Sequence, residues 1–85
     1  MATEDLSGDE LDAILTDLQR KLERLRVLYE QYFLGIERTP PYQAQKDVVR
    51  IIYRLQRAKL KGAAGKFRFQ SLMQRFSAHK AYWNR

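Results

Sequence analysis

The chain of 85 residues is long enough for one small domain, which buries only about 60–65% of the surface that its unfolded form exposes. It carries 16 Lys and Arg against 10 Asp and Glu, giving a formal net charge of +6. The absence of cysteine excludes disulfides, thiolate nucleophiles and cysteine-based zinc sites.

The N-terminal sequence is acidic, whereas secretory and transit peptides begin with basic residues. No apolar run approaches the roughly 20 residues that a membrane-spanning helix needs. We therefore expect a cytoplasmic protein without a membrane span.

Charge is distributed unevenly along the chain. Residues 1–17 hold six acidic side chains and no basic one, whereas residues 38–85 hold twelve basic side chains and one acidic one, Asp47. Such asymmetry marks an interaction surface, or else an internal contact in which the acidic start lies over a basic face. We expect a flexible acidic N-terminus over residues 1–6 and a single helical domain over residues 7–85.

A heptad repeat predicts the first helix, at about residues 9–34. Apolar residues recur at alternating spacings of four and three, at Leu11, Leu15, Leu18, Leu22, Leu25, Tyr29 and Tyr32. Ser7 and Glu10 match a capping box, and Gly35 is a suitable stop. This seam is either core within the chain or the interface of a homodimer.

A second, amphipathic helix is predicted at about residues 41–61. Thr39 is a good N-cap, and Pro40 suits the first helical position. One face is apolar, at Val48, Ile51, Ile52 and Leu55. Basic residues fall within a narrow arc opposite that face, at Lys46, Arg50, Arg54, Arg57 and Lys61.

Two glycines, Gly62 and Gly65, predict a break before a third helix at about residues 66–84. The apolar rhythm nevertheless continues through them, so one long helix is the alternative. The third helix has an apolar side with Phe69, Leu72 and Phe76. The fold class is therefore all-α, an antiparallel helical hairpin or three-helix arrangement with coiled-coil-like packing.

Residues suited to catalysis are few. His79 has no acidic residue within a helical turn, and the acidic residues of the first turn are explained by helix capping. Asp9 and Asp12 do not have the spacing of a calcium loop. We expect no enzyme activity, no cofactor and no metal site.

The basic arc is the main functional candidate. Together with nearby aromatic residues off the apolar seam, it gives a set of candidate partner-binding residues: Arg50, Arg54, Arg57, Lys61, Phe67, Arg68, Arg75 and Tyr82. Three interpretations remain open: a surface for an acidic protein partner, a track for nucleic-acid phosphates, or a solvated helix face.

Residues 67–76 (FRFQSLMQRF), the YWNR ending and residues 25–38 (LRVLYEQYFLGIER) resemble a largely uncharacterised helical signalling family of myxobacteria and related predatory bacteria. The resemblance covers about residues 25–85. It departs at residues 61–65, where the family has Asn-Thr pairs. Short stand-alone members include polarity factors that act with a response-regulator partner on a Ras-like GTPase. The resemblance implies signalling and supplies no catalytic residue. Together with the basic arc it leads us to predict a non-enzymatic adaptor in bacterial signalling or cell polarity, and the alternative is a nucleic-acid-binding protein that uses the same basic arc.

Overall fold

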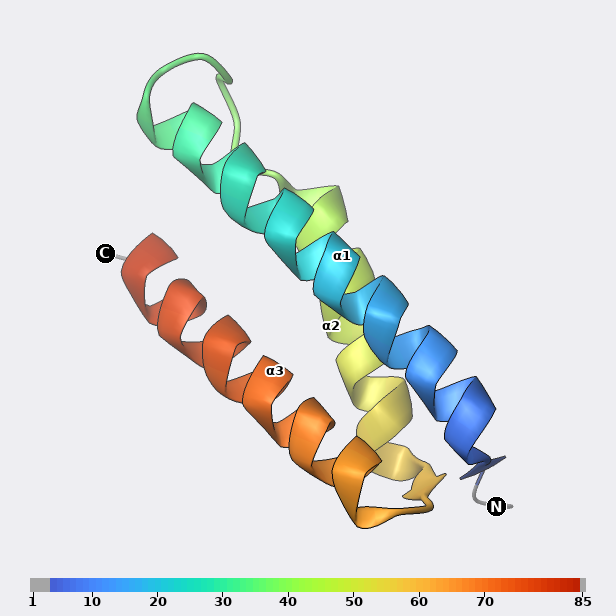
Figure 1. Ribbon diagram of the computed structural model, residues 1–85. Coiled ribbons are helices and arrows are strands. Elements are labelled where there is room, and N and C mark those ends of the chain that lie inside the picture. The colour runs from blue at the N-terminus through green and yellow to red at the C-terminus, as the bar shows by residue number, and fades with distance from the viewer. Residues whose placement is uncertain (1–3, 85) are drawn as a thin grey trace.

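The computed structural model describes residues 4–84, and within them the fold is all-α, as predicted. The helices are α1 (Gly8–Phe33), α2 (Tyr42–Arg57) and α3 (Ala63–Trp83). Helix α2 runs antiparallel to α1, and α3 returns in the direction of α1 (Figure 1). The radius of gyration is 14.1 Å, against about 12 Å for a compact domain of this length, so the molecule is elongated.

Helix α1 is the central element of the core. Its apolar seam is buried at six of the seven predicted heptad positions, Leu11, Leu15, Leu18, Leu22, Leu25 and Tyr29. The helix packs against both α2 and α3, whereas α2 and α3 make few direct contacts with each other. The seam is therefore core within the chain.

Both ends of α1 are capped as the sequence indicates. The Ser7 hydroxyl oxygen accepts a hydrogen bond from the Glu10 backbone N–H at 3.3 Å. Past the other end, Gly35 adopts a φ of 80°. The Ile36 N–H then donates to the Gln31 carbonyl at 2.9 Å, which is the bond that closes a Schellman motif.

Helix α2 begins at Tyr42 without a side-chain cap, so the prediction that Thr39 caps it is wrong. A residue that precedes proline is pushed out of the helical region, and two consecutive prolines extend that restriction from Thr39 through Pro40. The N-cap is therefore Pro41.

Helix α2 ends at Arg57, four residues before the predicted boundary at 61. Ala58 is extended, and the short strand β2 (Lys59–Leu60) follows. β2 pairs in parallel with β1 (Asp5–Leu6). Lys61 consequently lies on a connection and does not belong to the helix that we predicted.

The start of the described chain pairs with β2, in the segment of residues 1–6 for which the sequence predicts a flexible acidic N-terminus. The Leu6 side chain is buried in the core, and the Lys59 N–H donates to the Glu4 carbonyl at 2.7 Å. Residues 1–3 of that predicted segment lie outside the described residues. We call residues 4–6 the N-terminal clip.

The predicted break is present, but it lies before Gly65, and the alternative of one long helix is wrong. Gly62 has a φ of 95° and forms the N-cap of α3. Gly65 lies inside α3, where a Cβ atom would come within 2.3 Å of the Leu11 side chain. Gly65 therefore serves close helix packing.

Aromatic side chains join α3 to α1 at the far end of the molecule. The rings of Tyr29 and Trp83 stack with centroids 4.2 Å apart and an angle of 9° between their planes. Tyr82 packs edge-on against Phe33 at 5.7 Å. These contacts hold the C-terminal ends of α1 and α3 together.

Candidate functional site

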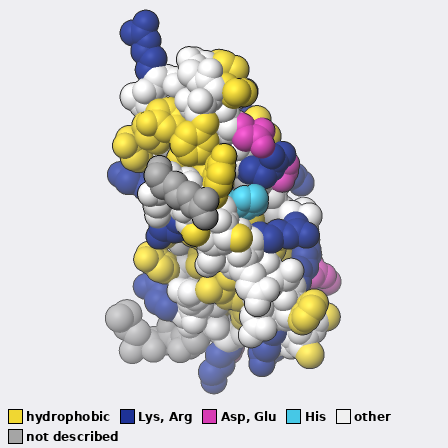
Figure 2. Space-filling view, turned by 90° about the vertical axis from the view of Figure 1, so that its left-hand side faces the viewer, with side chains coloured by type: hydrophobic (Ala, Val, Ile, Leu, Met, Phe, Trp, Pro, Cys, Tyr) yellow, Lys and Arg dark blue, Asp and Glu magenta, His cyan; other side chains and the backbone are white. Residues whose placement is uncertain are grey.

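Hydrophobic and basic side chains are both prominent on the face that carries α3. Figure 2 shows the largest gathering of hydrophobic side chains towards the upper end, Lys and Arg side chains spread from the top to the lower end, and the few Asp and Glu side chains in view along one edge. The large exposed hydrophobic residues at the end where α1 and α3 finish include Phe33 and Tyr82. Few direct contacts join α2 to α3, and a hollow lies between them.

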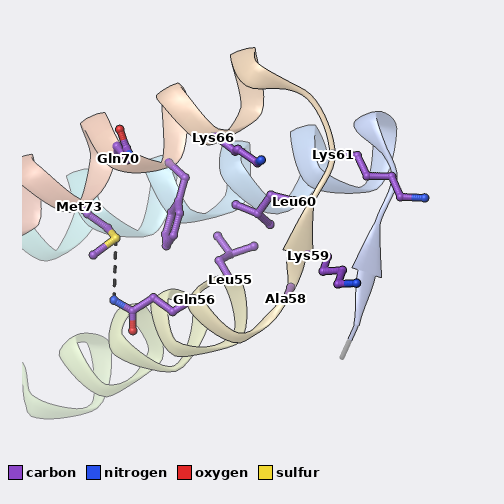
Figure 3. A pocket seen from close by; sticks show the side chains of 10 residues that line it. Leu55, Gln56, Ala58, Lys59, Leu60, Lys61, Lys66, Gln70 and Met73 are labelled. Atoms are coloured by element: carbon purple, nitrogen blue, oxygen red, sulfur yellow. Dashed lines mark hydrogen bonds between the residues drawn. The ribbon is translucent and has the colours of Figure 1, made fainter. Parts of the chain in front are cut away.

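A first hollow of about 720 Å³ lies between the C-terminal end of α2, β2 and the N-terminal half of α3. Leu55 and Leu60 point into it, Lys66 lies over it, and Lys61 extends from the connection at one end (Figure 3). We call it the basic hollow. Its lining residues are Leu55, Gln56, Ala58, Lys59, Leu60, Lys61, Lys66, Phe69, Gln70 and Met73.

A second hollow of about 600 Å³ lies along the N-terminal half of α2. We call it the tyrosine hollow, and it is lined by Tyr29, Tyr42, Gln45, Lys46, Val49, Arg50, Tyr53 and Asn84. Tyr42 is 62% exposed and Tyr53 is 58% exposed. Two aromatic rings on one helix are therefore accessible to a ligand.

The base of the tyrosine hollow is fixed by a hydrogen bond. The Tyr29 hydroxyl donates to Gln45 Oε1 at 2.5 Å and joins α1 to α2. Burial raises the pKa of Tyr29, and the neighbouring Tyr42 and Tyr32 add to the shift. Tyr29 therefore remains a neutral donor at neutral pH.

The two hollows lie one after the other along α2, and residues of α3 or of its C-cap complete each of them. Tyr53 lines the tyrosine hollow, and Gln56, three residues further along α2, lines the basic hollow. Gln56 Nε2 lies 3.9 Å from Met73 Sδ, a contact that bridges α2 and α3 (Figure 3). Hereafter we call the pair of hollows the α2–α3 groove.

The charge of the groove has one sign. Every charged side chain among the described residues that line it is basic, namely Lys46, Arg50, Lys59, Lys61 and Lys66. The groove therefore combines an apolar and aromatic lining with a positive rim, and it attracts acidic groups.

Three predicted binding arginines contact acidic groups within the molecule, and one of them is Arg50, whose Nη1 lies 4.0 Å from Asp47 Oδ1 on the same helix. Arg54 donates to the Glu4 carboxylate, with Nη2 2.7 Å and Nε 3.0 Å from Oε1. These hydrogen bonds lower the pKa of Glu4, an effect that desolvation partly opposes. Glu4, from the acidic start of the chain, therefore lies against the basic face of α2 at Arg54, as the second interpretation of the charge asymmetry expects.

Arg68 joins α3 to α1. Its Nη2 donates to Thr16 Oγ1 at 3.1 Å and to Gln19 Oε1 at 3.2 Å, and its Nη1 lies 3.8 Å from Asp12 Oδ1. The side chain therefore connects two helices on the side of α3 that faces α1.

The other predicted residues do not share one surface. Arg50 and Lys61 line the groove, and Arg57 is exposed at the end of α2. Phe67 and Arg75 lie on the α1-facing side of α3 around a small hollow of about 200 Å³.

Tyr82, also a predicted site residue, packs against Phe33 at the far end and does not line the groove. The prediction also missed groove residues, among them Tyr42, Tyr53, Lys66 and Met73. A signal for α2 was present, because residues 42, 49 and 53 share one helix face.

Within residues 4–84, no group of three or more His, Asp or Glu side chains is placed to hold a metal ion. None of the described helices is long and apolar enough to cross a membrane. Comparison of the chain with protein-family models, curated proteins and solved structures finds no match. The chemistry of the groove is therefore the basis for a function.

Proposed function

We propose that this protein is a non-enzymatic helical adaptor that binds an acidic segment of a protein partner in the α2–α3 groove. The observation that carries the proposal is the groove itself, whose lining is apolar and aromatic and whose charged side chains are all basic. Bacterial signalling or cell polarity in the cytoplasm is the setting that the family resemblance implies.

The basic rim of the groove and its aromatic and apolar lining make different contributions to binding. Exposed ion pairs contribute about 0–1 kcal/mol each, so the lysines mainly steer and orient an acidic partner. Affinity comes from a few buried aromatic contacts, for which Tyr42 and Tyr53 are available.

A protein partner fits the groove better than nucleic acid. Phosphate tracking requires a continuous row of free cations, and Arg54, in the middle of the predicted row, is held by Glu4. The aliphatic lining of the basic hollow, with Leu55, Leu60 and Met73, also suits apolar side chains more than bases.

The test is a pair of charge-reversed variants with equal net charge. We expect Lys61→Glu with Lys66→Glu to lower the association rate constant for the partner on the order of tenfold at low salt, because the rim loses its steering charge. Arg20→Glu with Arg24→Glu, on exposed positions of α1, is the matched control and leaves the rate near that of the wild type.

The partner is obtained by affinity capture from lysate treated with nuclease, and its binding is then measured with purified components. Association of the Lys61/Lys66 variant at the wild-type rate contradicts the proposal. Capture that nuclease abolishes supports the nucleic-acid alternative.

A further inference from the structure

We infer that the occupant of the α2–α3 groove is an amphipathic α-helix of the partner, which carries acidic residues beside its apolar stripe and completes a four-helix bundle. This inference rests on the proposed function and specifies its partner. It follows from the arrangement of the helices, the spacing of the groove residues and their charge.

The arrangement leaves α2 and α3 with one closely packed helical neighbour each. In a four-helix bundle each helix packs against two neighbours. Here α1 has two neighbours, but α2 and α3 share only α1 and diverge from each other towards the end where α3 finishes (Figure 1). A fourth helix between them gives both their second neighbour.

The groove residues recur along α2 and α3 at the spacings that are typical of residues contacting a docked helix. On α2, Tyr42, Val49 and Tyr53 follow one another at seven and four residues and form one longitudinal stripe. On α3, Lys66, Gln70 and Met73 follow at four and three. Two helical stripes with apolar members are the surfaces into which the ridges of a third helix pack.

The length of α2 sets the length of the occupant. Its 16 residues span about 24 Å at 1.5 Å per residue, so a helix of about four turns covers the groove. Four turns place about five side chains on the buried stripe, with Asp or Glu on either side opposite Lys46, Arg50 and Lys66.

Charge complementarity favours a different protein, and not a second copy of this chain, as the occupant of the α2–α3 groove. The acidic helix of the described chain, α1, already buries its apolar seam against α2 and α3. The stripe of Tyr42, Val49 and Tyr53 on α2 is flanked by Lys46 and Arg50, so pairing it with the same stripe of a second copy brings like charges together. The occupant is therefore supplied by an acidic partner.

The experiment uses three synthetic peptides of 18 residues and the full chain labelled with ¹⁵N. The first peptide carries a leucine stripe flanked by glutamates on an alanine background. The second has two central alanines replaced by proline, which removes the helix and keeps the charge. The third has lysine in place of glutamate.

We expect the first peptide to bind at least tenfold more tightly than the other two and to gain helical circular dichroism on binding. Amide shifts concentrate along residues 42–53 and 66–73. Tyr53→Ala weakens binding, whereas Tyr82→Ala, a change of an equally exposed tyrosine outside the groove, leaves it unchanged.

If the first and second peptides bind with equal affinity, the inference of a helical occupant is wrong. The proposal of an acidic partner is then unaffected. Equal affinity of the first and third overturns both the inference and the charge argument. Failure of both acidic peptides to bind overturns the helix-in-groove inference, and the Lys61/Lys66 rate measurement then decides the proposed function separately.

Discussion

Gly65 shows how a single missing side chain sets the distance between α3 and α1. A glycine inside a helix costs about 1 kcal/mol relative to alanine. At this position, however, a Cβ atom would lie 2.3 Å from Leu11 Cδ2, and Leu11 is only 1% exposed. The buried leucine has little room to move away.

We therefore expect Gly65→Ala to lower the free energy of unfolding by about 1–3 kcal/mol, because the overpacking cost exceeds the gain in helix propensity. Gly8→Ala, at a helical position with open space around it, is the control and is expected to be neutral or stabilising. Chemical denaturation monitored by circular dichroism measures both. A stabilised Gly65→Ala variant would show that α1 and α3 separate at low cost.

Glu4 and Arg54 give the N-terminal clip a dependence on pH. The Arg54 hydrogen bonds lower the pKa of Glu4 in the folded chain. A carboxyl group with a lowered folded-state pKa contributes stability that is present above its unfolded pKa and is lost as pH falls through the folded value. The hydrogen bonds between Arg54 and Glu4 therefore stabilise the clip at neutral pH, and this stabilisation is lost at acidic pH.

We expect Arg54→Gln to raise the pKa of Glu4 back towards its ordinary value, measured from the carboxyl ¹³C shift during an NMR titration. Arg57→Gln is the matched control, because Arg57 makes no hydrogen bond or ion pair in the described part of the chain. An unchanged Glu4 pKa in Arg54→Gln means that the pair does not persist in solution.

Among the structural elements, the pairing of β1 with β2 most alters the architecture expected from the sequence. It buries Leu6, which is 1% exposed, and draws residues 58–61 out of the helix. We expect Leu6→Ala to cost about 2 kcal/mol or more in unfolding free energy, since it removes a buried leucine side chain. Leu34→Ala, at a site that is 76% exposed, should change it by less than about 0.5 kcal/mol.

Both values come from urea unfolding of the purified chain. A Leu6→Ala variant as stable as Leu34→Ala would mean that the clip adds nothing to the core.

The sequence predicted those elements whose signals are local. The heptad seam of α1, the Ser7 cap and the stop at Gly35 all depend on residues within a few positions of one another. The end of α2 depends on pairing with a segment more than 50 residues earlier, which no local pattern records.

The candidate site was predicted less well for a related reason. Helical periodicity identified Arg50 and placed all of the basic arc except Lys61 on α2, but it does not reveal which basic side chains bind acidic groups of other elements. Arg54 and Arg68 are held by Glu4 and by α1, respectively. Tyr42 and Tyr53 line a hollow together with Tyr29 and Asn84, which lie far from them in the sequence.

For the whole molecule, the burial of the α1 seam against α2 and α3 bears on whether the chain associates with its own copy. Six of the seven heptad positions are buried within the chain, and the charged residues that line the groove are all basic. We expect a monomer in sedimentation equilibrium at micromolar concentration. A dimer that persists at low salt would show that another surface, such as the exposed residues around Leu34 and Ile36, associates with its own copy.

The N-terminal clip also has a consequence for the order of folding. Glu4 and Lys59 are distant in sequence, and closing so long a loop is entropically costly until α1 and α2 have packed and brought its ends together. The clip therefore forms after the helical hairpin and opens before it. In native-state hydrogen exchange, the Lys59 amide should exchange through a local opening of lower free energy than the amides of central α1, so the molecule unfolds from its strand pair inwards.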